Sequence, residues 1–127
     1  MSAVSTHILD TVRGEPASGV VVRLERVEVG TRGQAGPSQL GRGETDADGR
    51  IADFGVDLLP AGTYRLVFET GPYLTTAHPG QAHQAGQGGP DPFFPEVVVT
   101  FTADGRRPRY HVPLLLSPYS YATYRGS

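Results

Sequence analysis

The chain has 127 residues, of which 38% are hydrophobic and 19% charged, and these values predict one globular domain over residues 1–127. Its formal net charge of -2 gives no general attraction to nucleic acid or to anionic lipid, and the absence of cysteine excludes disulfides, a thiol nucleophile and a thiolate metal site. The start MSAVSTHILD lacks the long apolar segment of a signal peptide. We therefore expect a cytoplasmic protein with no nucleic-acid and no membrane partner.

Short segments rich in β-branched and aromatic residues, separated by Gly, Pro and Asp turn signals, predict an all-β fold. In chain order, the predicted strands cover residues 6–9, 20–29, 38–45, 63–70, 96–102, 110–116 and 119–124. Alternation is clearest in 63–70, where Tyr64, Leu66 and Phe68 share one face. Seven to eight such strands predict a two-sheet β-sandwich with at most one short helix.

Two Asp-Gly turns follow predicted strands, in DADGR at residues 46–50 and in ADGRR at residues 103–107. Each predicts a hairpin-type reversal between two strands. Arg50 ends the first turn, where a solvent-facing arginine is ordinary, so its position alone does not indicate a ligand role. Pro113 lies inside a predicted strand and removes a ladder donor, which predicts a local distortion next to His111.

An irregular Gly/Pro-rich loop is predicted at about residues 72–95. It has room for at most a single helical turn near residues 73–77, because Pro79 and the glycines after it prevent extension. A loop of this size in a compact domain is normally functional or mobile.

The four histidines are the side chains that titrate nearest to neutral pH. His7 and His111 lie in predicted strands, and for either one alone a structural or surface role is the simpler interpretation. His78 and His83 lie in the irregular loop, and their spacing matches no standard zinc motif. We therefore predict no metal site. Serine catalysis is also not indicated, since the chain has no Gly-x-Ser-x-Gly elbow.

Four stretches, which together extend over nearly the whole chain, resemble the transthyretin-like family. They are STHILDTVRGEPASGVVVRL, TDADGR, FFPEVVVTF and YHVPLLLSPYSYATYRGS. LLSPYSY is shared with the hormone carrier of the family and supports only the fold, whereas the ending YRGS resembles the enzyme branch, which hydrolyses 5-hydroxyisourate in urate degradation. The resemblance implies a transthyretin-like sandwich and this hydrolase activity, without a metal and without a cofactor.

The resemblance also implies a set of site residues. Those implied to be catalytic are His7, Arg50, His111 and Ser127, and those implied to bind substrate are the same four together with Tyr124, Arg125 and Gly126. The two histidines would activate water and transfer protons, with the choice of general base left open, and the arginine would orient the substrate. The terminal residues would complete the pocket wall. This role would explain why an apolar strand runs directly into the chain end without a polar tail.

The family fold implies that the first, penultimate and last strands share one sheet, which brings His7, His111 and the tail together. It also implies a homotetramer, built as a dimer of dimers, with the sites in the channel between dimers. The apolar strand EVVVTF fits this assembly, because a second subunit would cover its free edge. A carrier of small ligands without catalysis is the alternative, and an adhesion or scaffold module is a third reading. A carrier needs an apolar channel, whereas the implied site is polar.

Overall fold

The structure is a computed structural model that describes residues 2–27, 38–79, 83–84 and 90–126. Its elements in chain order are β1 (Val4–Asp10), β2 (Glu15–Pro16), β3 (Val21–Val27), β4 (Ser38–Glu44), β5 (Arg50–Ile51), β6 (Gly62–Glu69), α1 (Thr70–Ala77), β7 (His83–Gln84), β8 (Pro90–Asp91), β9 (Val97–Ala103), β10 (Tyr110–His111), β11 (Leu114–Ser117) and β12 (Ser120–Thr123). Within these residues seven strands have four or more residues, and the single helix is short. The predicted all-β class is confirmed; residues 28 and 29 of the predicted strand 20–29 lie outside the described residues.

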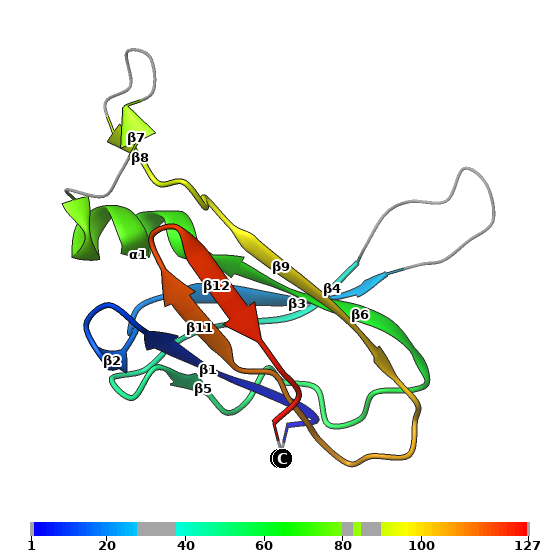
Figure 1. The fold of residues 1–127 in the computed structure, drawn as a ribbon. Coiled ribbons are helices and arrows are strands. Elements are labelled where there is room, and N and C mark those ends of the chain that lie inside the picture. The colour runs from blue at the N-terminus through cyan, green and yellow to red at the C-terminus, as the bar shows by residue number, and fades with distance from the viewer. Residues whose placement is uncertain (1, 28–37, 80–82, 85–89, 127) are drawn as a thin grey trace, which may run out of the picture.

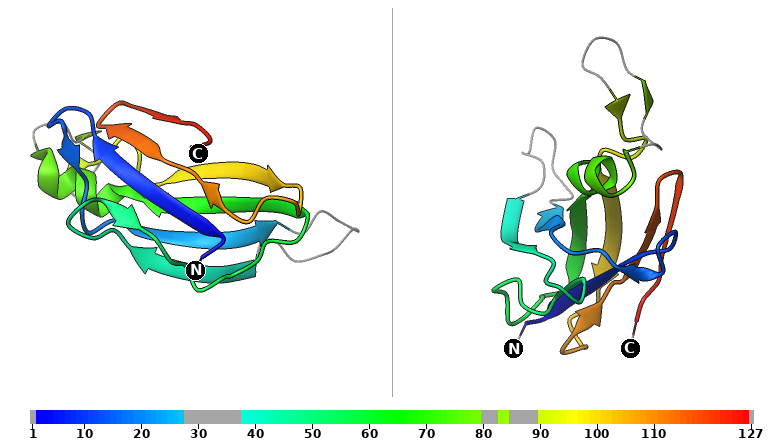
Figure 2. Two further views of the ribbon diagram at one scale, coloured as in Figure 1. Left: turned by 90° about the horizontal axis from the view of Figure 1, so that it is seen from below. Right: turned by 90° about the vertical axis from the view of Figure 1, so that its left-hand side faces the viewer.

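Two sheets form the two layers of the sandwich (Figure 1). One has the order β10-β1-β11-β12, with β2 and β5 also pairing with β1, and the other has the antiparallel order β4-β3-β6-β9. β1 pairs in parallel with both β10 and β11. The first, penultimate and last strands therefore share one sheet, as the sequence resemblance implied. Figure 2 shows this sheet packed across the other, with α1 at one end.

The core lies between the sheets and consists of apolar side chains that alternate along the strands. Fully buried examples are Val4 and Ile8 of β1, Val22 and Leu24 of β3, Tyr64, Leu66 and Phe68 of β6, and Leu114 and Leu116 of β11. Burial of each such side chain contributes about 1.5–3 kcal/mol. The predicted inner face of β6 is thus confirmed. Because the period of a strand is two, the same alternation turns Ser5 and His7 of β1 to the outer face of their sheet.

The two Asp-Gly turns are tight, but the expectation that they form hairpins is wrong. Gly49 and Gly105 have φ of +73° and +78°, as tight turns require. The first turn leads from β4 to β5, which pairs with β1, and the second leads from β9 to β10, which also pairs with β1. Each turn therefore carries the chain from one sheet to the other. In the first, the Asp46 carboxylate accepts backbone N–H bonds from within the turn, so no hairpin ladder is needed there.

The predicted strand over residues 110–116 is broken in its middle, as Pro113 indicated. β10 ends at His111 and β11 begins at Leu114. The carbonyl groups in the gap are satisfied by side chains, because the Thr6 hydroxyl donates to Val112 O at 2.6 Å and the Thr123 hydroxyl donates to Pro113 O at 2.7 Å. The break is therefore a fixed part of the sheet, and His111 lies at its edge.

The helix is longer than the single turn predicted near residues 73–77, and that prediction is wrong. α1 begins at Thr70, which the sequence placed in the preceding strand, and it ends before Pro79 as expected. The Thr70 hydroxyl donates to Phe94 O at 2.7 Å, and the Gly71 N–H donates to Pro95 O at 2.9 Å. These bonds anchor the first turn, where proline is tolerated. Of the predicted irregular loop, residues 80–82 and 85–89 lie outside the described residues.

Among the described residues, no helix has the length and apolar character that would be needed to cross a membrane.

Candidate functional site

His7 and Arg50 are cross-strand neighbours on the outer face of the sheet that contains β1. They are Cα partners in the antiparallel pairing of β1 with β5, so their side chains lie on the same face. The turn that delivers Arg50 is fixed by Asp46, whose Oδ1 accepts the Arg50 N–H at 3.0 Å. Gly49 is required in this turn for a second reason, since a Cβ there would lie 2.5 Å from Ile8 O.

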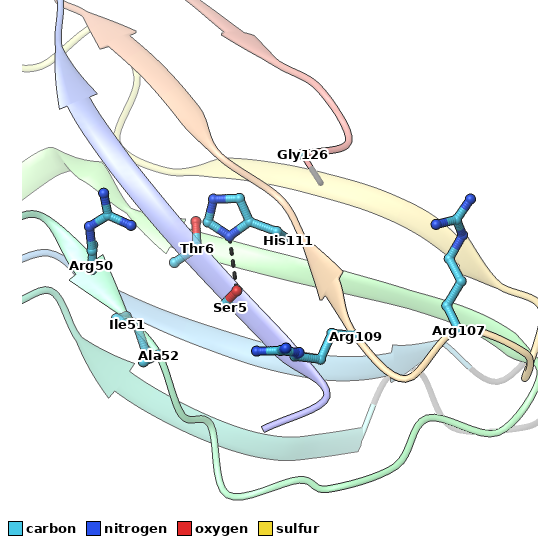
Figure 3. Close-up of a pocket in the computed structure, with 9 residues that line it drawn as sticks. All are labelled: Ser5, Thr6, Arg50, Ile51, Ala52, Arg107, Arg109, His111 and Gly126. Atoms are coloured by element: carbon cyan, nitrogen blue, oxygen red, sulfur yellow. Dashed lines mark hydrogen bonds between the residues drawn. The ribbon is translucent and has the colours of Figure 1, made fainter. Parts of the chain in front are cut away.

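His111 lies beside this pair on the other side of β1. Ser5 and His111 are Cα partners in the parallel pairing of β1 with β10, and Ser5 Oγ lies 2.9 Å from His111 Nδ1. Figure 3 shows the imidazole over Ser5, with Arg50 across the strand. When Nδ1 donates its hydrogen to Ser5 Oγ, Nε2 presents a lone pair. Ser5 can thus fix the tautomer in which the ring accepts a proton.

The surroundings of His111 favour the neutral imidazole. Partial burial lowers the pKa of His111 below its usual 6.5, and the electrostatic influence of His7 and Arg50 lowers it further, against a hydrogen bond to the Ser5 backbone that raises it. A neutral imidazole at neutral pH is the form that can act as a general base.

An open cavity of about 380 Å³ borders His111 (Figure 3). The residues that line it are Ser5, Thr6, Arg50, Ile51, Ala52, Arg107, Arg109, His111 and Gly126. Three of these nine residues are arginines, so the cavity is suited to an oxygen-rich or anionic ligand. His7 is not among the residues that line the cavity, but it is the Cα partner of Arg50, which does line it.

The chain end is attached to the site through Gly126. The Gly126 N–H donates to His111 O at 2.8 Å, and the two residues form an isolated antiparallel bridge. A Cβ on Gly126 would lie 2.6 Å from His111 Cδ2, which is closer than real contacts allow. The lack of a side chain at Gly126 therefore permits the close approach of the chain end to the His111 ring.

The other tail residues, Tyr124 and Arg125, do not line the cavity beside His111. Tyr124 and Arg125 line a second, apolar groove of about 220 Å³ between β9 and β12, together with Val99, Phe101 and Val112 among others. In the single chain they do not border the cavity of His111, and their assignment to substrate binding stays a prediction. Ser127, predicted to be catalytic, lies outside the described residues.

The sequence analysis missed Ser5, Arg107 and Arg109. Ser5 could have been found, because it precedes His7 by two residues and a strand places both on one face. The arginines belong to the run RRPR after the second Asp-Gly turn. Their position at the cavity was not predicted, because that turn was expected to form a hairpin-type reversal between two strands.

His78 lies apart from this cavity. Its Nε2 is 2.7 Å from Asp10 Oδ2, and the Tyr73 hydroxyl donates to the same oxygen at 2.7 Å. Three or more His, Cys, Asp or Glu side chains that could hold a metal do not meet anywhere in the described part of the chain. His83 was considered above as a metal ligand, and its side chain lies outside the described part of the structure.

Comparison with known proteins places this architecture in a family. The sequence model of the HIUase/Transthyretin family matches the chain over residues 4–126. The chain is 42% identical over 125 residues to a protein named 5-hydroxyisourate hydrolase from Salmonella dublin, covering 98% of this chain and 80% of that protein.

Solved structures of both branches are similar to this one. The structure of Klebsiella pneumoniae 5-hydroxyisourate hydrolase has a TM-score of 0.74 and 36% identity, and the match covers 100% of each chain. The crystal structure of transthyretin from Sparus aurata has a TM-score of 0.78 and 32% identity, with 99% of this chain and 97% of that chain covered. The fold is therefore common to both branches, and the distinction between them depends on the site.

Proposed function

This chain belongs to the HIUase/Transthyretin family, and we propose that it hydrolyses 5-hydroxyisourate in urate degradation. Water is added across a ring acyl C–N bond, and the product is 2-oxo-4-hydroxy-4-carboxy-5-ureidoimidazoline. The observation that carries the proposal is the placement of His111, which contacts Ser5 through Nδ1 and borders an open cavity together with Arg50. The family match over residues 4–126 supports the expectation of one domain.

His111 is the proposed general base. Its depressed pKa supports a neutral ring at the pH of the cell, and Ser5 supports a tautomer with a free lone pair on Nε2. The lone pair would take a proton from water as the water oxygen attacks the acyl carbon. The departing ring nitrogen needs a proton in return, and His7, the cross-strand neighbour of Arg50, is proposed to supply it. The need for a base near neutral pH is the reason that histidine suits this reaction.

Arg50 is proposed to hold the substrate and to stabilise the developing oxyanion. Its guanidinium has five N–H donors in a planar fork, which match the oxygen atoms of a planar, carbonyl-rich ring. Its position is supported by the fixed turn and by the pairing with β1. Oxyanion donors typically contribute about 100- to 1,000-fold to the rate.

The tail is proposed to complete the site. The contact between Gly126 and His111 supports this role for the chain end, and the Ser127 hydroxyl or backbone N–H would supply a donor to the substrate. Tyr124 and Arg125 are proposed to contribute from the neighbouring groove. No metal or cofactor is required by this mechanism, since both protons and the nucleophile come from histidine and water.

A small-ligand carrier is the weaker alternative. Such a carrier would need an apolar channel, whereas the cavity beside His111 is lined by three arginines and a histidine. These groups are costly to desolvate for an apolar ligand and useful for hydrolysis.

We further propose that the protein is a cytoplasmic homotetramer, a dimer of dimers. β9 and β12 are at the edges of their sheets, and exposed edges with apolar side chains such as Val98 are normally covered. The apolar groove between the two edges supports the same conclusion. The absence of cysteine fits the reducing cytoplasm. Light scattering at micromolar concentration tests the assembly, and a fully active monomer would contradict it.

Ultraviolet absorbance of freshly generated 5-hydroxyisourate tests the activity. Chelator-treated protein should remove the compound well above its spontaneous rate, and a rate equal to the spontaneous one would overturn the proposal. Activity that disappears with chelator and returns with zinc would refute the metal-free mechanism. Arg50→Gln should lower the rate about 100-fold, because it removes the charged donor and leaves the fold intact.

A further inference from the structure

Two arginines that the proposed mechanism does not use line the same cavity as His111. Arg107 and Arg109 precede β10 and line the cavity together with Arg50. Figure 3 shows the guanidinium of Arg109 extending toward the segment of Ile51 and Ala52, and that of Arg107 standing apart on the other side. The cavity therefore has positive charge around much of its rim.

The segment that carries these arginines is held at both ends. The Tyr110 hydroxyl donates to Asp104 Oδ1 at 3.0 Å and accepts the Asp104 N–H at 3.1 Å, and the Arg106 N–H donates to Asp104 Oδ1 at 2.8 Å. Tyr110 is itself buried, and its N–H donates to Ala3 O at 2.8 Å. Pro108 restricts the backbone between these anchors. The two guanidinium groups are thus presented from a fixed loop.

None of the salt bridges between described residues involves the arginines on the rim. Among the residues that the structure describes, no carboxylate lies within the 4.0 Å of an ion pair from Arg50, Arg107 or Arg109. Arg106, in the same run, does not line the cavity, and its backbone N–H and its charge lower the pKa of Asp104. The run RRPR therefore contains two arginines that line the cavity and one that does not.

We propose that Arg107 and Arg109 are substrate-binding residues that form, with Arg50, an arginine rim for the oxygen atoms of the ligand. The proposal rests on the proposed function, because hydrolysis of an acyl C–N bond passes through an oxyanion and leaves a carboxylate. Guanidinium groups bind such oxygens in bidentate fashion. Unlike Arg50, which is proposed to stabilise the oxyanion, Arg107 and Arg109 would bind the ligand oxygens from entry to release, and so bind the ground state and the transition state alike. Uniform binding of this kind lowers KM and leaves kcat unchanged.

Steady-state kinetics on the intact protein test the rim. The double variant Arg107→Gln/Arg109→Gln should raise KM about tenfold with kcat within about twofold, and each single variant should give part of that rise. Added sodium chloride should raise KM of the parent more than that of the double variant, because salt screens the charges that only the parent has. Arg106→Gln is the matched control and should behave as the parent. All three positions are exposed, so the melting temperatures should stay equal.

An unchanged KM in the double variant would overturn the proposal, as would an equal rise in Arg106→Gln, which would indicate a general effect of net charge. A calorimetric titration with urate, a planar purine monoanion at neutral pH, separates the rim from the activity. If the parent does not hydrolyse 5-hydroxyisourate but binds urate more tightly than the double variant, the proposed function fails and the rim stands. Equal urate affinities overturn the rim, and a parent that neither hydrolyses nor binds urate overturns both.

Discussion

His111 and His78 are both partly buried histidines with a hydrogen-bonding side chain beside them, but their surroundings differ. His111 contacts the Ser5 hydroxyl, borders an open cavity and has cationic neighbours. His78 contacts the Asp10 carboxylate, which is 1% exposed. That carboxylate also accepts bonds from Tyr73 and from the backbone of the turn after β1.

The cluster of Asp10, Tyr73 and His78 stabilises the fold. Burial alone would raise the pKa of Asp10, but the bonds from Tyr73, from the Arg13 N–H and from His78 together hold that pKa below 3.8. Burial is the largest cause and the hydrogen bond to Asp10 the second largest, and together they raise the pKa of Tyr73 to about 12. The cluster thus joins α1 to the turn after β1. The comparison teaches that the partner and the access of solvent, rather than the residue type, separate a histidine for chemistry from one for stability.

The largest effect is expected for His111→Asn, which should lower kcat/KM by about 100-fold or more because the proposed base is lost. His78→Asn, the matched change in the other cluster, should leave turnover per folded molecule within about twofold. Steady-state rates beside melting curves measure both. Equal losses of activity in the two variants would erase the distinction between the clusters.

Gly126→Val should come next, with a loss of about 10- to 100-fold in kcat, since misplacement of a catalytic group by about 1 Å can have that cost. The added side chain would enter the space of the His111 ring, where a Cβ alone would lie 2.6 Å from Cδ2. Thermal melting and light scattering should match the parent, because the core is untouched. Normal kinetics in this variant would mean that the chain end can move away without consequence.

Asp10→Asn should reduce stability by about 2 kcal/mol and leave kcat unchanged, because it weakens several bonds to a buried carboxylate far from the cavity. Denaturant titration measures this loss. Tyr73→Phe removes one bond to the same carboxylate and should cost about 1 kcal/mol. Because the folded pKa of Asp10 lies below 3.8, its contribution is present above that pH and is lost as the pH falls through the folded value. A stable but inactive Asp10→Asn protein would contradict the assignment.

The smallest effect concerns pH. The pKa of His111 lies below 6.5, so kcat/KM should fall on acidification only below that value, as the ring becomes protonated. Arg50→Gln removes one of the positive charges that lower this pKa and should move the acidic limb of its residual activity upward by a few tenths of a unit. Titration of the His111 ring by NMR gives the same quantity directly. A downward shift would mean that Arg50 does not act on His111 through its charge.

The sequence by itself determined the fold class and the family. The alternation in β6 predicted the buried face of Tyr64, Leu66 and Phe68, because side-chain direction in a strand follows from a period of two. Pro113 predicted the break between β10 and β11, since proline cannot donate to a ladder. The resemblance in the ending YRGS indicated the enzyme branch, and the match to the HIUase/Transthyretin family confirms the family.

Only the tertiary structure decided where the two Asp-Gly turns deliver their residues. Local sequence encodes a tight turn through the left-handed glycine, but the choice of the next partner strand depends on which sheet offers a free edge. Both turns cross to the sheet of β1 and so bring Arg50 and the Arg107–Arg109 segment to the cavity of His111. The helix start at Thr70 was decided in the same way, by bonds to residues more than twenty positions away. Contacts of this kind depend on packing between elements, which no local pattern records.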